Sequence, residues 1–455
     1  MPQPRVAPYG SWASPITSDL IVASSIGLGG VLIDGSDIYW IENRPQEQGR
    51  SVIVRCSPDG RTGDVTPPVP QAGKAAFNAR TRVHEYGGGA YLVSSAVVYF
   101  CNDADQRLYR QEGEAAPVPI TEAPRQPRGL RYADGVMDTA RSRMIWVCED
   151  HQTGSEQPTN TLVDIPIDGS RPERVLVSGN DFYAAPRLSP DNTQLAWLEW
   201  RHPNMPWDGT ELWVGRCVAD GTIAEKKKVG GGDSESICQP EWSPDGVLYF
   251  VSDRSGWWNL YRIVGDPLTA NGRVEAVYPL SAEFGSAQWS FRPSRYAFAS
   301  AQRLICSYLH DGSASLASID LSTLALTSIA TEFTEIGSVC ADADNVYFVG
   351  ASPTHFPAIV KLAPNSGQVA ILKPSNTQDV RVYHGYLSIA QPIEFPTENG
   401  LTAFALFHPP VNRDFSAPAD ELPPLIVRSH GGPTSAFSSA LDWGVQYWTT
   451  VDLPF

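Results

Sequence analysis

The tetrapeptide His430-Gly431-Gly432-Pro433 carries the clearest chemical signal in this 455-residue sequence. It follows the apolar run 425–427, which has the composition of a buried strand. Two glycines in this position let the backbone approach a substrate carbonyl and present N–H groups that stabilise an oxyanion during acyl transfer. An ordinary tight turn is the alternative. The sequence thus predicts His430, Gly431 and Gly432 as an oxyanion-side turn, with His430 a structural partner rather than a general base.

A second polar group, Arg82, His84 and Glu85, precedes three consecutive glycines at 87–89. His84-Glu85 begins like a zinc-binding motif, but glycine occupies the position of the second histidine, so no metal is expected. No helix is expected after the glycines, which argues against phosphate binding. Two interpretations stay open. The segment is either a structural loop, or it lines a substrate channel where Arg82, His84 or Glu85 contacts a peptide terminus.

The overall composition excludes several classes of partner. The chain has 34 basic and 50 acidic residues, and its net charge of −16 repels nucleic acid and anionic membranes. Its one concentrated basic run, 226–228, is interpreted as a solvated turn. No uncharged apolar run reaches the roughly 20 residues that span a bilayer. We therefore expect neither nucleic acid nor a membrane as partner.

The cysteines and the remaining glycine-rich run point to neither a disulfide framework nor a cofactor. The seven cysteines are odd in number and widely scattered, which is typical of a reducing, cytoplasmic environment. The run 27–32 lacks the last glycine of a dinucleotide-binding fingerprint, and no helix is expected behind it. We expect a cytoplasmic protein without a cofactor.

A recurring unit organises the first 375 residues. In its clearest copies, a Ser-Pro-Asp turn at 189–191 or 243–245 precedes an aromatic-rich strand, at 195–198 or 247–251, and then a second strand at 211–214 or 259–263. Weaker copies lie at 37–41, 97–100, 143–147, 289–319 and 345–349. About seven such units with alternating apolar and polar positions predict a β-propeller of about seven blades. A pair of β-sandwiches is the alternative.

The pattern changes after about residue 380. Strands are expected at 386–389, 403–407 and 425–427, and Leu441, Val445 and Trp448 follow one another at helical spacing. A strand, a glycine-rich turn and an amphipathic helix in succession are typical of an α/β domain.

Three segments carry a resemblance to a known family. The stretch 424–435 with Gln446-Tyr447-Trp448 resembles the entry to the catalytic domain in the acylaminoacyl-peptidase and dipeptidyl-aminopeptidase-like branch of the prolyl oligopeptidase family. Residues 77–89 resemble a segment of the early propeller of that branch, and residues 14–18 resemble its N-terminal approach. The resemblance implies a propeller that caps an α/β-hydrolase domain, a Ser-Asp-His triad, and cleavage of short peptides near their N-termini.

The sequence departs from this family in one respect. Such enzymes carry the nucleophile on a G-x-S-x-G elbow, and no such pattern occurs in these 455 residues. We therefore expect no catalytic triad in the chain, a β-propeller domain over 1–380 with its N-terminal lead-in, and an incomplete α/β-hydrolase domain over 381–455. A premature stop, a frameshift or a split gene would each produce this arrangement.

Two functional hypotheses follow. The first is that the chain is part of a peptidase for peptide substrates and is inactive alone, either as a decayed gene product or as one half of an enzyme whose second chain supplies the rest of the hydrolase domain. The second is that it is a free-standing propeller that binds peptides or proteins. We favour the first, because a binding module has no use for an oxyanion turn. In either case, the residues after about 380 are expected to pack loosely.

Overall fold

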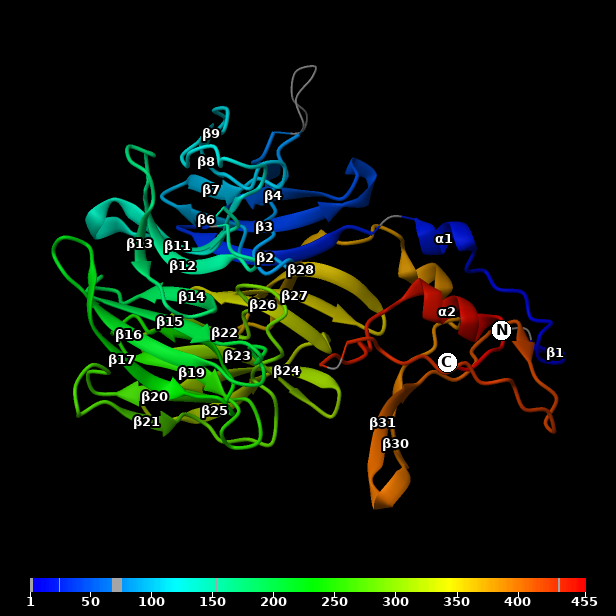
Figure 1. The fold of residues 1–455 in the computed structure, drawn as a ribbon. Helices are drawn as coiled ribbons and strands as arrows, with labels where there is room; N and C mark the ends of the chain where they lie inside the picture. Colours follow the sequence, from blue (N-terminus) through cyan, green and yellow to red (C-terminus); the bar gives the residue numbers. More distant parts are fainter. Residues whose placement is uncertain (1–2, 24, 68–75, 153, 433) are drawn as a thin grey trace.

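The computed structural model describes residues 3–23, 25–67, 76–152, 154–432 and 434–455. In this part of the chain, seven four-stranded antiparallel sheets follow one another and surround a common axis (Figure 1). The four strands of each sheet are consecutive in sequence and pair in that order. The chain thus contains the seven-bladed β-propeller that the repeats predict.

The strands of the blades have the following bounds. Blades 1 and 2 are β2 (Gly27–Asp34), β3 (Asp37–Arg44), β4 (Arg50–Cys56) and β5 (Thr62–Asp64), then β6 (Tyr91–Ser94), β7 (Val97–Cys101), β8 (Leu108–Glu112) and β9 (Val118–Pro119). Blades 3 and 4 are β10 (Leu130–Asp138), β11 (Arg143–Asp150), β12 (Thr159–Pro166) and β13 (Arg174–Val177), then β14 (Phe182–Leu188), β15 (Gln194–Trp200), β16 (Glu211–Cys217) and β17 (Ile223–Gly231). Blades 5, 6 and 7 are β18 (Ile237–Trp242), β19 (Leu248–Ser252), β20 (Asn259–Val264) and β21 (Arg273–Ala276), then β22 (Tyr296–Ser300), β23 (Arg303–His310), β24 (Ser313–Asp320) and β25 (Ala325–Ile329), then β26 (Glu335–Ala341), β27 (Val346–Ser352), β28 (His355–Ala363) and β29 (Gln368–Pro374).

The second strand of each blade forms the centre of the core. Six of these seven strands carry a fully buried large aromatic side chain, namely Trp40, Phe100, Trp146, Trp197, Phe250 and Phe348. Each such burial contributes about 1.5–3 kcal/mol, which explains why these strands are the most recognisable part of every repeat. The strands predicted at 37–41, 97–100, 143–147, 195–198, 247–251 and 345–349 are confirmed as β3, β7, β11, β15, β19 and β27.

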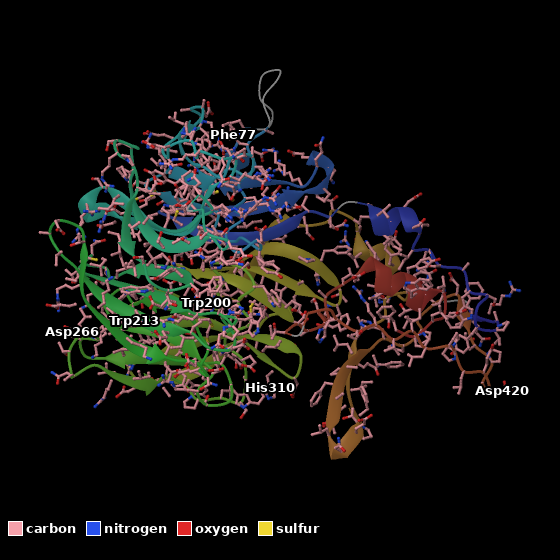
Figure 2. All side chains as sticks on the ribbon, viewed as in Figure 1. Phe77, Trp200, Trp213, Asp266, His310 and Asp420 are labelled. Atoms are coloured by element: carbon pink, nitrogen blue, oxygen red, sulfur yellow. The ribbon has the colours of Figure 1, made fainter. Side chains whose placement is uncertain are left out.

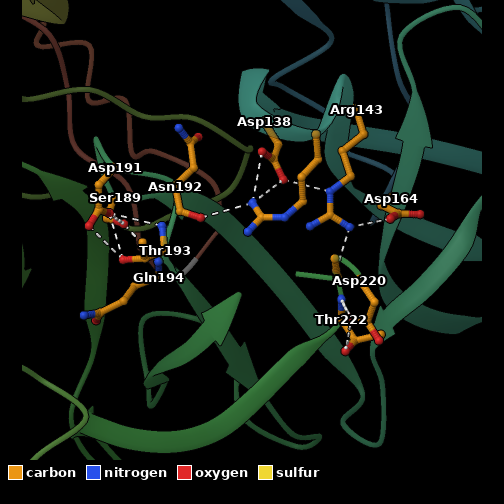
Figure 3. A network of polar contacts seen from close by, with 12 residues as sticks. Asp138, Arg143, Asp164, Ser189, Asp191, Asn192, Thr193, Gln194, Asp220 and Thr222 are labelled. Atoms are coloured by element: carbon orange, nitrogen blue, oxygen red, sulfur yellow. Dashed lines mark hydrogen bonds and ion pairs between the residues drawn. The ribbon is translucent and has the colours of Figure 1, made fainter. Parts of the chain in front are cut away.

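The Ser-Pro-Asp turns that mark two of the repeats have the same local structure. The Ser189 hydroxyl donates to Asp191 Oδ1 at 2.6 Å (Figure 3). The Ser243 hydroxyl donates to Asp245 Oδ1 at the same distance. These short side-chain bonds close the turn before the buried second strand begins.

An ionic cluster joins blade 3 to blade 4 (Figure 3). The buried Arg143 donates from Nε to Asp138 Oδ2 at 2.8 Å and from Nη1 to the Gly221 carbonyl of blade 4 at 2.6 Å. Its other carboxylate partner, Asp164, also pairs with two arginines on the surface. Burial opposes ionisation of Asp164, but the bonds from these arginines outweigh burial and lower its pKa.

The ring closes between blades 7 and 1 without a shared strand. The Ile26 N–H donates to the Ser375 carbonyl at 2.9 Å, and the Cys340 thiol lies 2.9 Å from the Val31 carbonyl. Trp40 of blade 1 belongs to the same hydrophobic cluster as Tyr347 of blade 7. Packing of side chains therefore holds the two ends of the ring together.

The residues beyond the last blade extend away from the propeller (Figure 1). β30 (Gln391–Pro396) and β31 (Thr402–Phe407) form an isolated antiparallel hairpin, and every residue of β30 is exposed (Figure 2). β32 (Phe415–Ser416) pairs in parallel with β1 (Arg5–Val6), and α2 (Trp443–Thr450) packs beside α1 (Ser18–Val22). The N-terminal lead-in thus packs against the C-terminal segment. Short 3-10 helices span Pro45–Glu47, Thr139–Arg141, Val380–Tyr383 and Glu398–Gly400.

Several predictions for the C-terminal segment need correction. The strand at 403–407 and the helix are confirmed, but residues 386–389 and 425–427 form no strand, because no neighbouring strand pairs with them. The buried residues of α2 are Trp443, Gln446, Thr449 and Thr450, whereas Trp448 of the predicted stripe is exposed. No α/β-hydrolase domain is evident in the described residues.

Two further observations concern the surface. The lysine run 226–228 is not a turn but part of β17, the outer strand of blade 4, where lysines discourage pairing with another strand. Among the described residues, no helix combines the length and the apolar character that crossing a membrane requires.

Candidate functional site

The innermost strands of the propeller are bulged, and the bulges bring polar residues to its axis. Register shifts interrupt β2, β10, β14, β18 and β26. Each bulge contains a residue with positive φ, namely Gly30, Asp134, Ala185, Gln239 and Ser338. Since a bulge re-aims the side chains beside it, these strands direct polar groups toward the axis as well as into the blades.

A cavity of about 500 Å³ lies beside three of these bulges, those of β10, β14 and β18, and its volume suits a small ligand. Its wall is rich in aromatic side chains from three parts of the chain: Phe182, Trp200, Trp207, Trp289 and Phe291. Figure 2 shows Trp200 inside the propeller. We call this cavity the aromatic chamber.

His84 and Glu85 both line the aromatic chamber, and both have a backbone conformation that is rare outside glycine. Their φ angles are 53° and 64°. The buried Glu149 accepts the His84 N–H at 2.8 Å, and Arg131 pairs with both Glu85 and Glu149. The bond from Arg131 lowers the pKa of Glu85. Neighbouring groups therefore hold this strained loop in place.

The His84 ring forms part of the apolar wall. Its centroid lies 5.2 Å from that of Phe182, 5.6 Å from Trp200 and 4.8 Å from Phe291. Burial lowers the pKa of His84 to about 4, against the attraction of Glu149. At neutral pH the imidazole is thus uncharged, and it does not present a positive charge to a ligand.

Arg82, the third residue of the predicted group, does not line the chamber. Its Nε pairs with Asp103 at 3.0 Å, on the side of the loop facing blade 2. Of the three predicted residues, the structure thus places His84 and Glu85 in the wall of the chamber and Arg82 outside it.

The predicted oxyanion-side turn lies against the rim of the same chamber. Trp289 Nε1 donates to the Thr434 carbonyl at 3.0 Å, and a Cβ placed on Gly432 would lie 3.6 Å from the Trp289 ring. Trp289 also packs against Trp207, with centroids 4.3 Å apart, and against Tyr86 at 5.1 Å. The structure thus brings the loop of His84 and Glu85 and the turn at 430–432, which are far apart in sequence, to the same aromatic chamber.

The backbone of the turn is open to solvent. His430, Gly431 and Gly432 are exposed, and within the described residues the N–H groups of Gly431 and Gly432 have no hydrogen-bond acceptor. Pro433 lies outside the described residues. The His430 ring contacts the Phe437 ring, and its Nδ1 lies 3.4 Å from the Gly431 carbonyl oxygen.

Sequence reasoning missed Glu149, Trp200, Trp207 and Phe291. Their contribution depends on which loops of different blades meet, and strand patterns carry no such information. Trp289 was noticed, but as the start of a blade, whereas β22 begins only at Tyr296 and Trp289 lies in the loop before it. The abundance of tryptophan near loops was the one available signal.

Comparison with known proteins gives both a negative and a positive result. No protein-family model and no curated protein matches the chain. Among solved structures, a puromycin-hydrolyzing peptidase from Mycobacterium tuberculosis is 35% identical with a TM-score of 0.89, over 99% of this chain and 68% of that chain. A puromycin hydrolase is 33% identical with a TM-score of 0.88 over the same shares, and a mutant of a puromycin hydrolase has been solved complexed with PGG.

A prolyl endopeptidase shares the fold at 12% identity, with a TM-score of 0.69 over 95% of this chain and 61% of that chain. The fold and these likenesses define a peptidase-type β-propeller. The chain belongs to the prolyl oligopeptidase family.

Proposed function

We propose that this chain is the substrate-binding propeller of a serine peptidase and holds short peptides beside an oxyanion-binding turn. The bond from Trp289 to the Thr434 carbonyl is the observation that supports this most, because it joins the chamber to the turn. The relatives are named as peptidases and hydrolases, and one of them binds PGG. Cleavage near the N-terminus, as in the acylaminoacyl-peptidase and dipeptidyl-aminopeptidase-like branch, is the activity we infer for the complete enzyme.

The chemistry assigned to the chain is binding and electrostatic stabilisation. The N-terminal residue of the peptide enters the aromatic chamber, where Phe182, Trp200 and Phe291 favour a large apolar side chain. The carbonyl to be attacked then lies near Gly431 and Gly432, whose N–H groups can bind the developing oxyanion. Fixing the peptide in this way contributes positioning, which accounts for a large part of many enzymatic accelerations.

The nucleophile, acid and base are assigned to a hydrolase domain for which residues 381–455 supply only the first part. Residues 1–380 form the propeller unit of this proposal. The β30–β31 hairpin exposes apolar side chains on both faces, Ile393 and Phe395 on one and Phe404 on the other, and these offer surfaces on which the rest of that domain would pack, whether from a second chain or not. Alone, the chain is expected to be inactive and cytoplasmic.

Peptide binding tests the proposal. We expect the chain to bind the tripeptide Phe-Gly-Gly and puromycin, with a change in tryptophan fluorescence, because three tryptophans line the chamber. Trp289→Ala should weaken both ligands by about tenfold or more, through loss of a contact with the ligand and of the bond to the turn. Trp257→Ala, at an exposed tryptophan outside the chamber, is the matched control and should change neither. Equal affinities in the two variants would contradict the proposal.

A free-standing binding module is the alternative function, because the seven blades form a closed ring of their own. Labelling with a fluorophosphonate, which reacts with an activated serine, distinguishes the two hypotheses. We expect no specific label on the chain alone. Addition of a hydrolase fragment from a relative, carrying the G-x-S-x-G elbow, should produce a complex that is labelled and cleaves Phe-Gly-Gly. Peptide binding without any such complex would favour the binding module.

A further inference from the structure

The axis of the propeller is crossed by two loops that come from distant blades. Gly87–Gly89 lies between blades 1 and 2, and Ser290–Arg292 lies between blades 5 and 6. The Phe291 N–H donates to the Gly87 carbonyl at 2.8 Å, and Gly88 forms a parallel bridge with Phe291. Since blades 2 and 6 are not neighbours in the ring, these loops can meet only at its centre.

Three glycines make this crossing possible. A Cβ on Gly88 would lie 2.5 Å from the Phe291 carbonyl oxygen, and one on Gly89 would lie 2.9 Å from Asp134 Cα. A Cβ on Gly87 would overlap the Thr81 carbonyl. All three have positive φ. The close approach of three backbone segments explains the glycine run.

A network of charged and polar groups fixes the crossing to the surrounding blades. The Asp134 N–H donates to the Gly89 carbonyl at 2.9 Å, and the Asp134 carboxylate pairs with Arg187. Arg187 also pairs with Glu241, and Arg292 donates to the Gly135 carbonyl at 3.0 Å. Blades 3, 4 and 5 therefore all hold the crossing in place.

Two cavities meet at this crossing. The aromatic chamber lies on one side, and a second cavity of about 740 Å³, lined by β2, β6, β22 and β26, lies on the other. The residues that line both cavities are those of the crossing and its neighbours, namely Tyr86, Gln239, Ser290, Phe291, Arg292 and Pro293. The crossing is thus the wall between them.

We propose that Gly87–Gly89 and Ser290–Arg292 form a fixed partition that makes the aromatic chamber blind and limits the length of the peptide segment it accepts. This inference rests on the proposed function and deepens it. The substrates are short peptides whose N-terminal residue is large and apolar. Residues added before that residue meet the partition, whereas residues added after it extend past the turn.

Two peptides of equal composition test the limit on length. Phe-Gly-Gly-Gly-Gly should bind the chain at least about tenfold more tightly than Gly-Gly-Phe-Gly-Gly, because only the second must extend toward the partition. In Phe291→Ala the ratio of the two affinities should fall toward one, while in Phe291→Leu, which keeps most of the apolar volume, it should persist. Equal affinities in the wild type, or an unchanged ratio in Phe291→Ala, would overturn the inference.

Hydrogen exchange tests the partition without a ligand or a variant. The amides of Phe291 and Asp134 should exchange as slowly as amides of the buried strand β15. Exchange about 100-fold faster would identify a movable gate and overturn the fixed partition. If neither peptide binds, the proposed function fails, and the exchange rates then decide alone whether the partition exists.

Discussion

The propeller and the C-terminal segment use similar residues with different results. In the propeller, Trp146, Trp197 and Phe348 are fully buried between blades. In the C-terminal segment, Phe404, Leu425 and Val427 expose 78%, 60% and 81% of their surface. The difference teaches that apolar residues of a strand are buried only when neighbouring blades cover them. The β30–β31 hairpin forms its own ladder but leaves Phe404 exposed, and an isolated hairpin of this kind is marginally stable in water.

The largest expected effect concerns the buried aromatic residues. Trp197→Ala should lower the free energy of unfolding by about 3–5 kcal/mol, because it leaves a cavity in the core. Trp448→Ala, at a half-exposed position of α2, should cost less than about 1 kcal/mol. Urea unfolding of both variants measures the contrast. Similar losses would show that the C-terminal segment is packed as firmly as the blades.

The difference in stability loss between a buried and an exposed site should be somewhat smaller for ion pairs than for aromatic residues. Asp164→Ala leaves the buried Arg143 with one carboxylate fewer and should cost about 3 kcal/mol. Asp379→Ala, which removes an exposed partner of Arg381 after the last blade, should cost far less, because solvent screens this pair. Thermal unfolding of the two variants at equal ionic strength provides the measurement. A reversed order would mean that Arg143 is held by its remaining partners alone.

The pH dependence of stability should reveal His84. Since burial lowers its folded-state pKa to about 4, the unfolded chain binds more protons between the ordinary histidine pKa and pH 4, and stability falls as the pH falls through that window. From pH 6.5 to pH 5, the wild type should lose about 1.5 kcal/mol more than His84→Phe. Denaturant unfolding at both pH values tests this. Equal losses in the two proteins would place the His84 ring in contact with water.

The smallest effect is expected in the hairpin. Phe404→Ser should change the free energy of unfolding by no more than about 0.5 kcal/mol, since its side chain contacts almost nothing in this chain. Differential scanning calorimetry at two protein concentrations distinguishes this from self-association. A loss above 1 kcal/mol that grows with concentration would show that a second copy covers the hairpin.

The sequence predicted the features that depend on local pattern. The buried second strands were identifiable because Trp40, Trp146 and Trp197 each lie within a short apolar run that follows a turn, and the turn at 430–432 because glycines follow an apolar run. The chamber and the partition could not be identified from the sequence, because Phe291 and Gly88 meet only when the seven blades have closed into a ring. The strand expected at 425–427 failed for a related reason, since strand formation depends on partners that no local pattern records.

Hydrogen exchange of the chain with and without Phe-Gly-Gly tests the central claim, that one site combines the propeller loops with the turn. The account predicts that the peptide slows exchange at residues 84–89, 286–293 and 428–435 together, and leaves the outer strands β17 and β21 unchanged. Protection confined to the propeller loops, or found mainly in the outer strands, would contradict it.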